Sequence, residues 1–242
     1  MPNAAIMLCA GRAARMRGVV ADKVLAPLAG QPVLAYSVRA FLEAAVADYF
    51  VFVVRDAVQM AGVTSVLAKT GVPLNRVVFA AGGAERQDSV FHGLQQTPPE
   101  IATVFIHDCA RPLIAPASLR ALAAAAQRDR AAVLAHRVTD TIKQTPPRAG
   151  AKLGRLKLRD LQRETLWAME TPQAFARELI LEAYAKVRAK KLRVTDDAAA
   201  AALLGHAVTL VENPSPNPKL THPEDFAWAE LLLRKKSHPA KC

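Results

Sequence analysis

Short apolar runs alternate with helix-like segments through the first 136 residues of the chain. The runs are rich in β-branched and aromatic residues, which is typical of buried strands; they cover residues 5–8, 49–54, 76–80, 103–107 and 131–136. The segments between them carry apolar residues at helical spacing, over residues 33–45, 58–69, 85–95 and 116–128. Such alternation with short connections predicts an α/β fold, a Rossmann-like and mostly parallel sheet flanked by helices.

The alternation breaks between Thr139 and Leu166. A turn-rich loop at residues 143–150 has short polar flanks, which predicts a β-arm that projects from the main body and meets a partner surface. Beyond it we expect helices at residues 172–189, 196–204 and 223–234, the second capped by Thr195, and a strand at 207–212. Without an internal repeat or a clear boundary, residues 1–236 are predicted to form one domain, with the arm at about 139–166 and a basic tail at 237–242.

The composition of the chain indicates which kinds of partner it could bind. The 242-residue chain has 32 Lys and Arg against 21 Asp and Glu, but only 5% aromatic residues and no alternation of basic and aromatic side chains. A protein that handles small anionic substrates explains this balance, and a basic nucleic-acid-binding protein is the alternative from another class. The three cysteines form no CxxC pair, the first apolar run leaves no room for a leader, and no run approaches the ~20 residues of a membrane span. We therefore expect a cytoplasmic protein without nucleic-acid or membrane partners.

The segment from Ala4 to Lys23 has the pattern of an anion site. A buried strand runs into small residues, and four cations follow it: Arg12, Arg15, Arg17 and Lys23. Backbone N–H groups and fixed positive charge hold phosphates at such turns. The segment lacks the three glycines of a dinucleotide fingerprint and the GK[ST] of a P-loop, and taken alone it is also compatible with an ordinary strand-to-helix turn. The chain has no HExxH or GxSxG, which argues against a zinc site and a Ser/His/Asp triad.

Two further clusters follow predicted strands. Gly82-Gly83 comes after the third strand, and residues 108–111 come after the fourth. Because ligands of parallel sheets bind beyond the carboxyl ends of the strands, these clusters and Gly11 could share one crevice. Taken singly, Thr195 and the acids after it mark a helix start, and Lys219 is an ordinary surface lysine.

Several motifs occur together in a fixed order. They are CAGRAARM with a following DK (residues 9–23), GGAERQDSV (82–90), HDCARP (107–112), Asp140-Thr141, ETPQAF (170–175), VTDD (194–197) and NPKLTHPEDF (217–226). This order resembles the 2-C-methyl-D-erythritol 4-phosphate cytidylyltransferase family, nucleotide-diphospho-sugar transferases in fold, over residues 4–233. The motif set is specific to that family and its close relatives. Ribitol 5-phosphate cytidylyltransferases share most of it and are the alternative within this class.

The resemblance implies roles on the nucleotide side. The first loop, with Ala10 and Gly11, would wrap the triphosphate of CTP, and Arg15 and Lys23 would be catalytic residues that stabilise charge on the α-phosphate. Further contacts are implied at Gly82, Gly83, Arg86 and Ser89 for the cytosine, and at Asp108, Cys109 and Arg111 near the ribose. Mg²⁺, held mainly by the CTP phosphates, would lie close to Asp108.

The resemblance also implies an acceptor side and a second subunit. Residues that bind or position the sugar phosphate are implied at Thr141, Arg163, Thr171, Thr195 and Lys219, with Arg163 and Lys219 counted as catalytic. In this family the arm crosses into a second subunit, so a homodimer is implied in which Thr141 and Arg163 serve the partner's site. Four positions depart from the family pattern: Cys9, Ala13, Asp22 and Ala84.

The implied reaction fits these residue types. CMP passes from CTP to 2-C-methyl-D-erythritol 4-phosphate, a sugar-alcohol phosphate, and pyrophosphate leaves; the product, 4-diphosphocytidyl-2-C-methyl-D-erythritol, is a precursor in the non-mevalonate isoprenoid pathway. Both reactants are anions, so the main task is to neutralise charge and align them. Arginine suits bidentate phosphate contacts, lysine supplies a point charge, and Mg²⁺ on the triphosphate supplies the rest.

Overall fold

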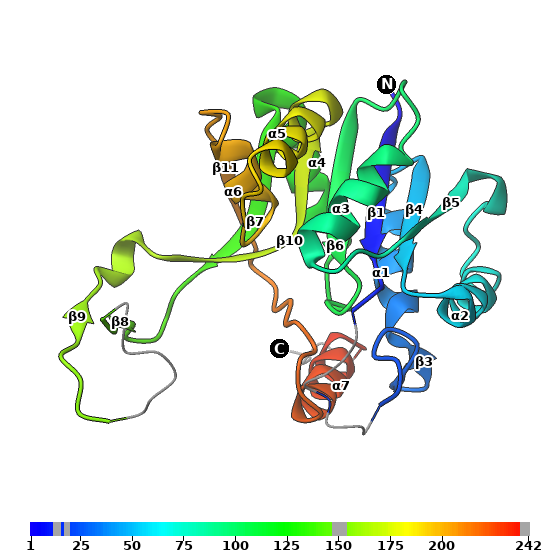
Figure 1. Cartoon of the computed structure of the whole chain (residues 1–242). Coiled ribbons are helices and arrows are strands. Elements are labelled where there is room, and N and C mark those ends of the chain that lie inside the picture. Colours follow the sequence, from blue (N-terminus) through cyan, green and yellow to red (C-terminus); the bar gives the residue numbers. More distant parts are fainter. Residues whose placement is uncertain (12–15, 17–19, 147–153, 238–242) are drawn as a thin grey trace.

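The computed structural model describes residues 1–11, 16, 20–146 and 154–237, and it centres on a seven-stranded sheet (Figure 1). The strand order is β11-β7-β10-β6-β1-β4-β5. Only β10 pairs antiparallel with its neighbours β6 and β7; the other pairings within this sheet are parallel. The predicted mostly parallel α/β sheet is confirmed. The strands are β1 (Asn3–Leu8), β4 (Tyr49–Val54), β5 (Val77–Ala81), β6 (Thr103–Asp108), β7 (Ala131–Arg137), β10 (Trp167–Ala176) and β11 (Thr209–Glu212).

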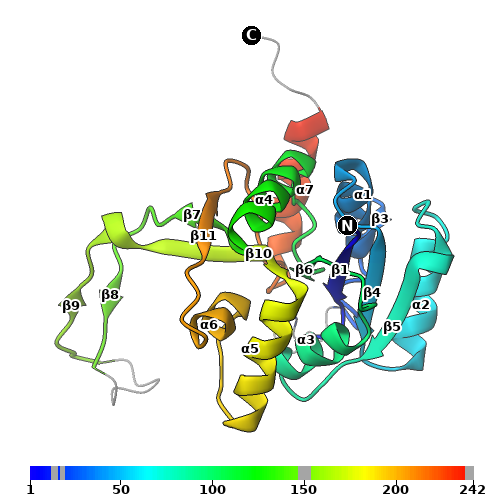
Figure 2. The same cartoon turned by 90° about the horizontal axis from the view of Figure 1, so that it is seen from above.

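Alternate side chains of the central strands pack into two hydrophobic cores, one on each face of the sheet. In β4, Phe50 and Phe52 pack into one core, and Val51 and Val53 into the other. Helices α1 (Val33–Ala44), α2 (Ala57–Leu67) and α4 (Pro116–Asp129) contribute to the first core. Helices α3 (Arg86–Gln95), α5 (Arg177–Ala189) and α6 (Asp197–Ala202) contribute to the second, on the opposite face from α1 and α4 (Figure 2).

A third, smaller hydrophobic cluster lies apart from the two cores of the main sheet. Helix α7 (Glu224–Ser237) packs beside the short hairpin of β2 (Pro27–Leu28) and β3 (Gln31–Pro32). Ala229 of α7 and Leu28 of the hairpin are buried in this cluster. Short 3-10 helices lie at Leu74–Arg76 and Arg163–Thr165. No helix in the described ranges is long and apolar enough to cross a membrane.

The segment between β7 and β10 forms the predicted arm. Strand β8 (Lys143–Gln144) pairs antiparallel with β9 (Arg159–Asp160), and both views show the arm extending away from the sheet and its helices (Figures 1 and 2). The arm exposes apolar side chains, with Leu158 at 57% exposure. Such an arm has little core of its own to hold it, because a two-stranded hairpin is only marginally stable in isolation.

Two predictions about the C-terminal half are wrong. The helix predicted at 172–189 begins as strand β10, and α5 starts only at Arg177. The helical spacing is overridden because Ala174 and Phe175 insert between β6 and β7, where both side chains are fully buried. Helix α6 is capped by Asp196, whose side chain accepts from Ala199 N at 2.9 Å, and not by the exposed Thr195 one position earlier.

Candidate active site

A pocket of about 490 Å³ opens at the carboxyl ends of β1, β4, β5 and β6. This is the edge at which ligands of parallel sheets bind. Two of the family-implied catalytic residues, Lys23 and Lys219, line it from distant parts of the chain. Seven other predicted site residues also line it: Ala10, Gly11, Gly82, Gly83, Arg86, Ser89 and Asp108. Of the three clusters that the sequence placed in one crevice, Gly11, Gly82-Gly83 and Asp108 do line this pocket, whereas Arg111 does not.

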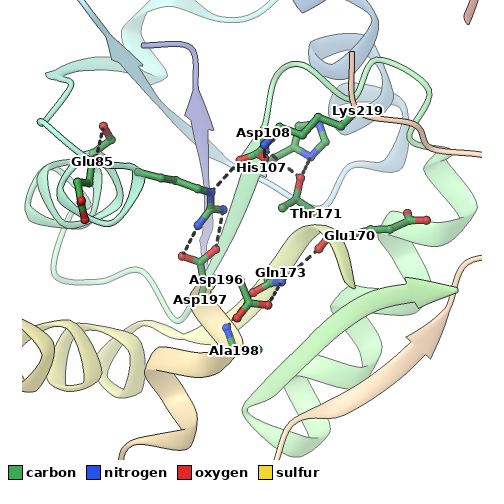
Figure 3. Close-up of polar contacts among 12 residues, drawn as sticks. Glu85, His107, Asp108, Glu170, Thr171, Gln173, Asp196, Asp197, Ala198 and Lys219 are labelled. Carbon is green, nitrogen blue, oxygen red and sulfur yellow. Dashed lines mark hydrogen bonds and ion pairs between the residues drawn. The ribbon is translucent and has the colours of Figure 1, made fainter. Parts of the chain in front are cut away.

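Asp108 is a carboxylate held between two cations at the end of β6. Figure 3 shows Asp108 and Lys219 side by side, and Asp108 Oδ2 accepts from Lys219 Nζ at 2.5 Å. Its Oδ1 accepts from Arg86 Nε at 3.1 Å. Burial by itself would raise the pKa of the Asp108 carboxyl, but Arg86, Lys219 and then Arg111 outweigh it and hold the pKa well below its usual range. Asp108 is thus ionised at any physiological pH.

Arg86 is fixed from its other side by a buried acid that the sequence reading did not assign to the site. Asp197, at the start of α6 and fully buried, accepts from both terminal nitrogens of Arg86, at 3.1 and 2.9 Å. The Tyr184 hydroxyl donates to Asp197 at 2.6 Å. Burial would lower the pKa of Arg86, but Asp197 and Asp108 raise it well above the ordinary value. The guanidinium is engaged by two carboxylates, so it orients Asp108.

Lys219 is held in place by anchored neighbours in the loop before α7. Asn217, two positions earlier, is buried and donates to Thr171 O at 3.0 Å and to Glu170 Oε2 at 2.8 Å. Leu220, directly after the lysine, is buried and its N–H donates to Ala110 O at 2.8 Å. The fixed backbone on both sides brings Lys219 to Asp108.

The two glycines after β5 allow the loops to approach closely. A Cβ on Gly82 would lie 2.5 Å from Ala10 Cβ, and one on Gly83 would lie 2.2 Å from Asp88 Cβ. Ser89 closes the turn, since its Oγ accepts from Gly83 N at 3.0 Å and donates to Glu85 O at 3.2 Å. A side chain at Gly82 would push the turn away from the first loop, and one at Gly83 would push it away from the start of α3.

Other predicted residues are not in the pocket lining. Thr171 lies buried beneath Asp108 and its Oγ1 accepts from Asp108 N at 3.0 Å, so it shapes the site from behind. The Cys109 side chain is fully buried, with its Sγ 3.3 Å from Cys9 Sγ; burial, and then the contact with Cys9, raises the pKa of its thiol well above the usual value. Arg111 donates to Asn217 O at 2.7 Å, and burial lowers the pKa of its guanidinium.

Three acceptor-side predictions lie on the surface. Thr141 and Arg163 are exposed in the arm, where Arg163 NH1 donates to Thr139 O at 3.1 Å. Thr195 is exposed ahead of α6. None of the three lines the described pocket. Arg15, like Ala13, lies outside the described residues.

The described residues fit a magnesium ion that arrives on a nucleotide better than a resident metal. Nowhere in the ranges covered do three His, Cys, Asp or Glu side chains gather as a metal site. Asp108 and Glu85 are the acids in the lining of the described pocket, and both oxygens of Asp108 already accept from cations. Mg²⁺ in nucleotide sites is usually held by one or two carboxylates and the substrate phosphates, which matches such a sparse donor set.

Comparison with known proteins places the chain in a family. The sequence profile of IspD, 2-C-methyl-D-erythritol 4-phosphate cytidylyltransferase, matches residues 3–235. The chain belongs to this cytidylyltransferase family. It is 37% identical over 233 residues to the 2-C-methyl-D-erythritol 4-phosphate cytidylyltransferase of Pelotomaculum thermopropionicum, covering 96% of this chain and 94% of that one. Identity to the enzyme of the same name from Shouchella clausii is also 37%, over 98% and 99% of the two chains.

Solved structures agree with the family assignment. The 2-C-methyl-D-erythritol 4-phosphate cytidylyltransferase of Thermus thermophilus superimposes with a TM-score of 0.72 at 30% identity, over 95% of this chain and 98% of that one. The 4-diphosphocytidyl-2C-methyl-D-erythritol synthase of Anaerococcus prevotii gives a TM-score of 0.82 at 23% identity, over 96% and 98%, which speaks for the fold alone. As a member of the IspD family, the chain is a nucleotidyltransferase.

Proposed function

We propose that this IspD-family chain transfers CMP from CTP to 2-C-methyl-D-erythritol 4-phosphate, releasing pyrophosphate and forming 4-diphosphocytidyl-2-C-methyl-D-erythritol. The observation that carries the proposal is the convergence of Lys23, Lys219, Asp108 and the Gly82-Gly83 turn on one pocket in a chain of this family. Two lysines and a close backbone turn suit a triphosphate and a second phosphate.

The reaction needs charge neutralisation more than proton transfer. The acceptor phosphate is ionised near neutral pH, so it can attack the α-phosphorus without a protein base. Lys23 stabilises the charge that develops on the α-phosphate, and Lys219, held by Asp108 at 2.5 Å, faces the acceptor phosphate. Arg15 stays a predicted partner of Lys23. Arg86 and Thr171 keep Asp108 in place from two sides.

Magnesium completes the proposed charge balance. Mg²⁺ bound mainly by the CTP phosphates, with Asp108 as its nearest protein carboxylate, would neutralise the triphosphate. Chelation of divalent ions should stop pyrophosphate release, and added Mg²⁺ should restore it. Full turnover in excess chelator would remove magnesium from the mechanism.

The decisive experiment compares acceptors. With CTP and Mg²⁺, the protein should release pyrophosphate with 2-C-methyl-D-erythritol 4-phosphate, and mass spectrometry should find the cytidylated product. Release only with ribitol 5-phosphate would replace the proposed acceptor. Retention of DNA or RNA that weakens with salt, without any release, would favour the nucleic-acid alternative.

The arm supports a proposed homodimer. Thr141 and Arg163 lie away from the pocket lining, and the arm exposes Ile142, Leu156 and Leu158, which a partner surface could cover. The rest of the chain to residue 236 would act as a single nucleotidyltransferase domain. Two free buried thiols in the described ranges fit a reducing cytoplasm.

Subunit mixing tests the arm directly. Arg163→Ala and Lys219→Ala proteins should each be inactive alone. If each arm serves the partner's site, a hybrid dimer has one complete site, and random exchange should recover about a quarter of wild-type activity. No recovery in a mixture that demonstrably exchanges subunits would place Arg163 outside the partner's site.

A further inference from the structure

Asp22 precedes the pocket residue Lys23, and its carboxylate has several partners. Its Oδ2 accepts from Gln59 Nε2 at 2.7 Å and from Arg55 NH2 at 3.2 Å. Its Oδ1 accepts from Val24 N at 3.1 Å, which closes a turn around Lys23. The residue that departs from the family pattern beside the lysine is therefore tied to the end of β4 and the start of α2.

Gln59 is the centre of this arrangement. It is 1% exposed, and its Nε2 also donates to Cys9 O at 3.0 Å, while its Oε1 accepts from Arg55 N at 2.7 Å. Both amide hydrogens and the amide oxygen are thus used. Its own N–H donates to Asp56, the N-cap of α2, at 2.7 Å. With its side chain and backbone both bonded, Gln59 is a rigid support.

The two donor bonds of Gln59 reach the beginning and the end of the first loop. Cys9 directly follows β1, and Asp22 directly precedes Lys23. On the far side of the lysine, Val24 is 3% exposed and its carbonyl accepts from Leu34 N at 2.9 Å. Lys23 therefore lies between two anchored residues and projects from a fixed point of the pocket rim.

We propose that Gln59 and Asp22 are positioning residues of this chain, which set Lys23 against the CTP triphosphate. The inference rests on the proposed function, because it takes the role of Lys23 from there. Arg55 contributes by holding Asp22, and it lines the same pocket. Displacement of a catalytic group by about 1 Å can cost a hundredfold in rate, so one buried glutamine can control turnover.

The substitution Gln59→Glu tests the proposed role of Gln59. The new carboxylate keeps the acceptor for Arg55 N, but it faces Asp22 and the Cys9 carbonyl without a hydrogen to donate. We expect kcat/KM for CTP to fall about 10- to 100-fold, with the KM for the sugar phosphate within about twofold of wild type. A merely structural role would lower stability without this split between the two substrates.

Gln87→Glu is the matched control. Gln87 also bridges backbone groups, donating to Leu192 O at 3.2 Å and accepting from Val194 N at 2.9 Å, but it lies outside the lining of the candidate site. The same substitution there should cost stability and leave kcat/KM for CTP within about threefold of wild type. Equal kinetic losses in both variants would overturn the proposal.

A reciprocal exchange tests the Asp22–Gln59 bond itself. In the double variant Asp22→Asn with Gln59→Glu, the amide introduced at position 22 can donate to the carboxylate introduced at position 59, so the link next to Lys23 re-forms with its direction reversed. Recovery of at least a third of the lost kcat/KM for CTP would support the proposal. A folded double variant no better than Gln59→Glu would overturn it. Wild-type turnover with CTP is the reference; if that is absent, the proposed function fails instead.

Discussion

Acidification should destabilise the protein through one buried ring, His107. The residue is fully buried, with Nε2 3.2 Å from Ser37 Oγ and Nδ1 3.3 Å from Thr171 Oγ1. Burial lowers the pKa of His107 from 6.5 to about 4, and the neighbouring Asp108 offsets only part of this effect. The ring is therefore neutral in the folded protein at pH 7 and stays neutral well into the acid range.

The sign and size of this pH effect on the free energy of unfolding follow from proton linkage. Between the unfolded pKa of 6.5 and the folded pKa of about 4, the unfolded chain binds a proton that the folded chain does not, so stability rises with pH. Each pH unit in this window changes the free energy of unfolding by about 1.4 kcal/mol. The contribution is complete above pH 6.5, and about 2.7 kcal/mol of it is lost on reaching about pH 4.5.

Urea unfolding across this pH range, on wild type and His107→Gln, measures the effect. Glutamine does not titrate and can still bond Ser37, so the acid-induced loss should be about 2.7 kcal/mol larger in wild type. Parallel stability curves for the two proteins would refute the reasoning. If the variant does not fold, NMR can follow the ring signals of His107 in the wild-type protein as the pH is lowered. A pKa near the ordinary value would contradict the effect of burial.

Three other predictions concern turnover and stability. Lys23→Ala and Lys219→Ala should each lower kcat about 10²- to 10³-fold in the pyrophosphate assay, and surface Lys69→Ala should not; wild-type rates in folded Lys23 or Lys219 variants would contradict their roles. Asp197→Asn should lower stability by about 3 kcal/mol, a drop of about 6–12 °C in melting temperature, because it leaves the Arg86 charge under-paired. Thermal melting checks this against Asp129→Asn, which breaks a partly exposed ion pair with Arg128 and should shift the melting temperature far less. Finally, kcat/KM for the acceptor should rise with an apparent pKa of about 6, that of a phosphate monoester, and then level off; a second, basic limb would indicate a protein acid.

Local sequence signals were sufficient where an element is apolar on both faces. The run at Tyr49–Val54 is apolar throughout and forms β4 with the bounds predicted for it. Strand β10 was not predicted because its alternation of apolar and polar residues is short. This alternation merges with the helical spacing of Leu179, Ile180 and Ala183, which belong to α5. What makes Gln173–Ala176 a strand is its pairing with β6, about 70 positions earlier in the chain. No local window contains that information.

The charge pairings in the candidate site could not be predicted from local sequence either. The sequence pointed to Arg86 as a nucleotide contact, but the charge of that arginine is engaged by Asp197, a residue 111 positions away. Gln59 was missed for the same reason, since its partners Cys9 and Asp22 lie 50 and 37 positions away. One signal for Asp197 was available: of two adjacent acids at a helix start, only Asp196 is needed as the cap. The second is then available for another partner, which in the structure is Arg86.

The state of Asp108 connects this charge network to the chemistry. A carboxylate bonded to both Arg86 and Lys219 is a poor proton acceptor near neutral pH, because a proton on one oxygen would displace one charge-assisted hydrogen bond and weaken the other. It therefore cannot act as the general base of the transfer. An acceptor phosphate that is already ionised needs no such base. In the proposed mechanism, the paired Asp108 instead keeps Lys219 at a fixed point until an anionic substrate competes for it. The proposed acceptor-side cation would then be in position before the substrate binds.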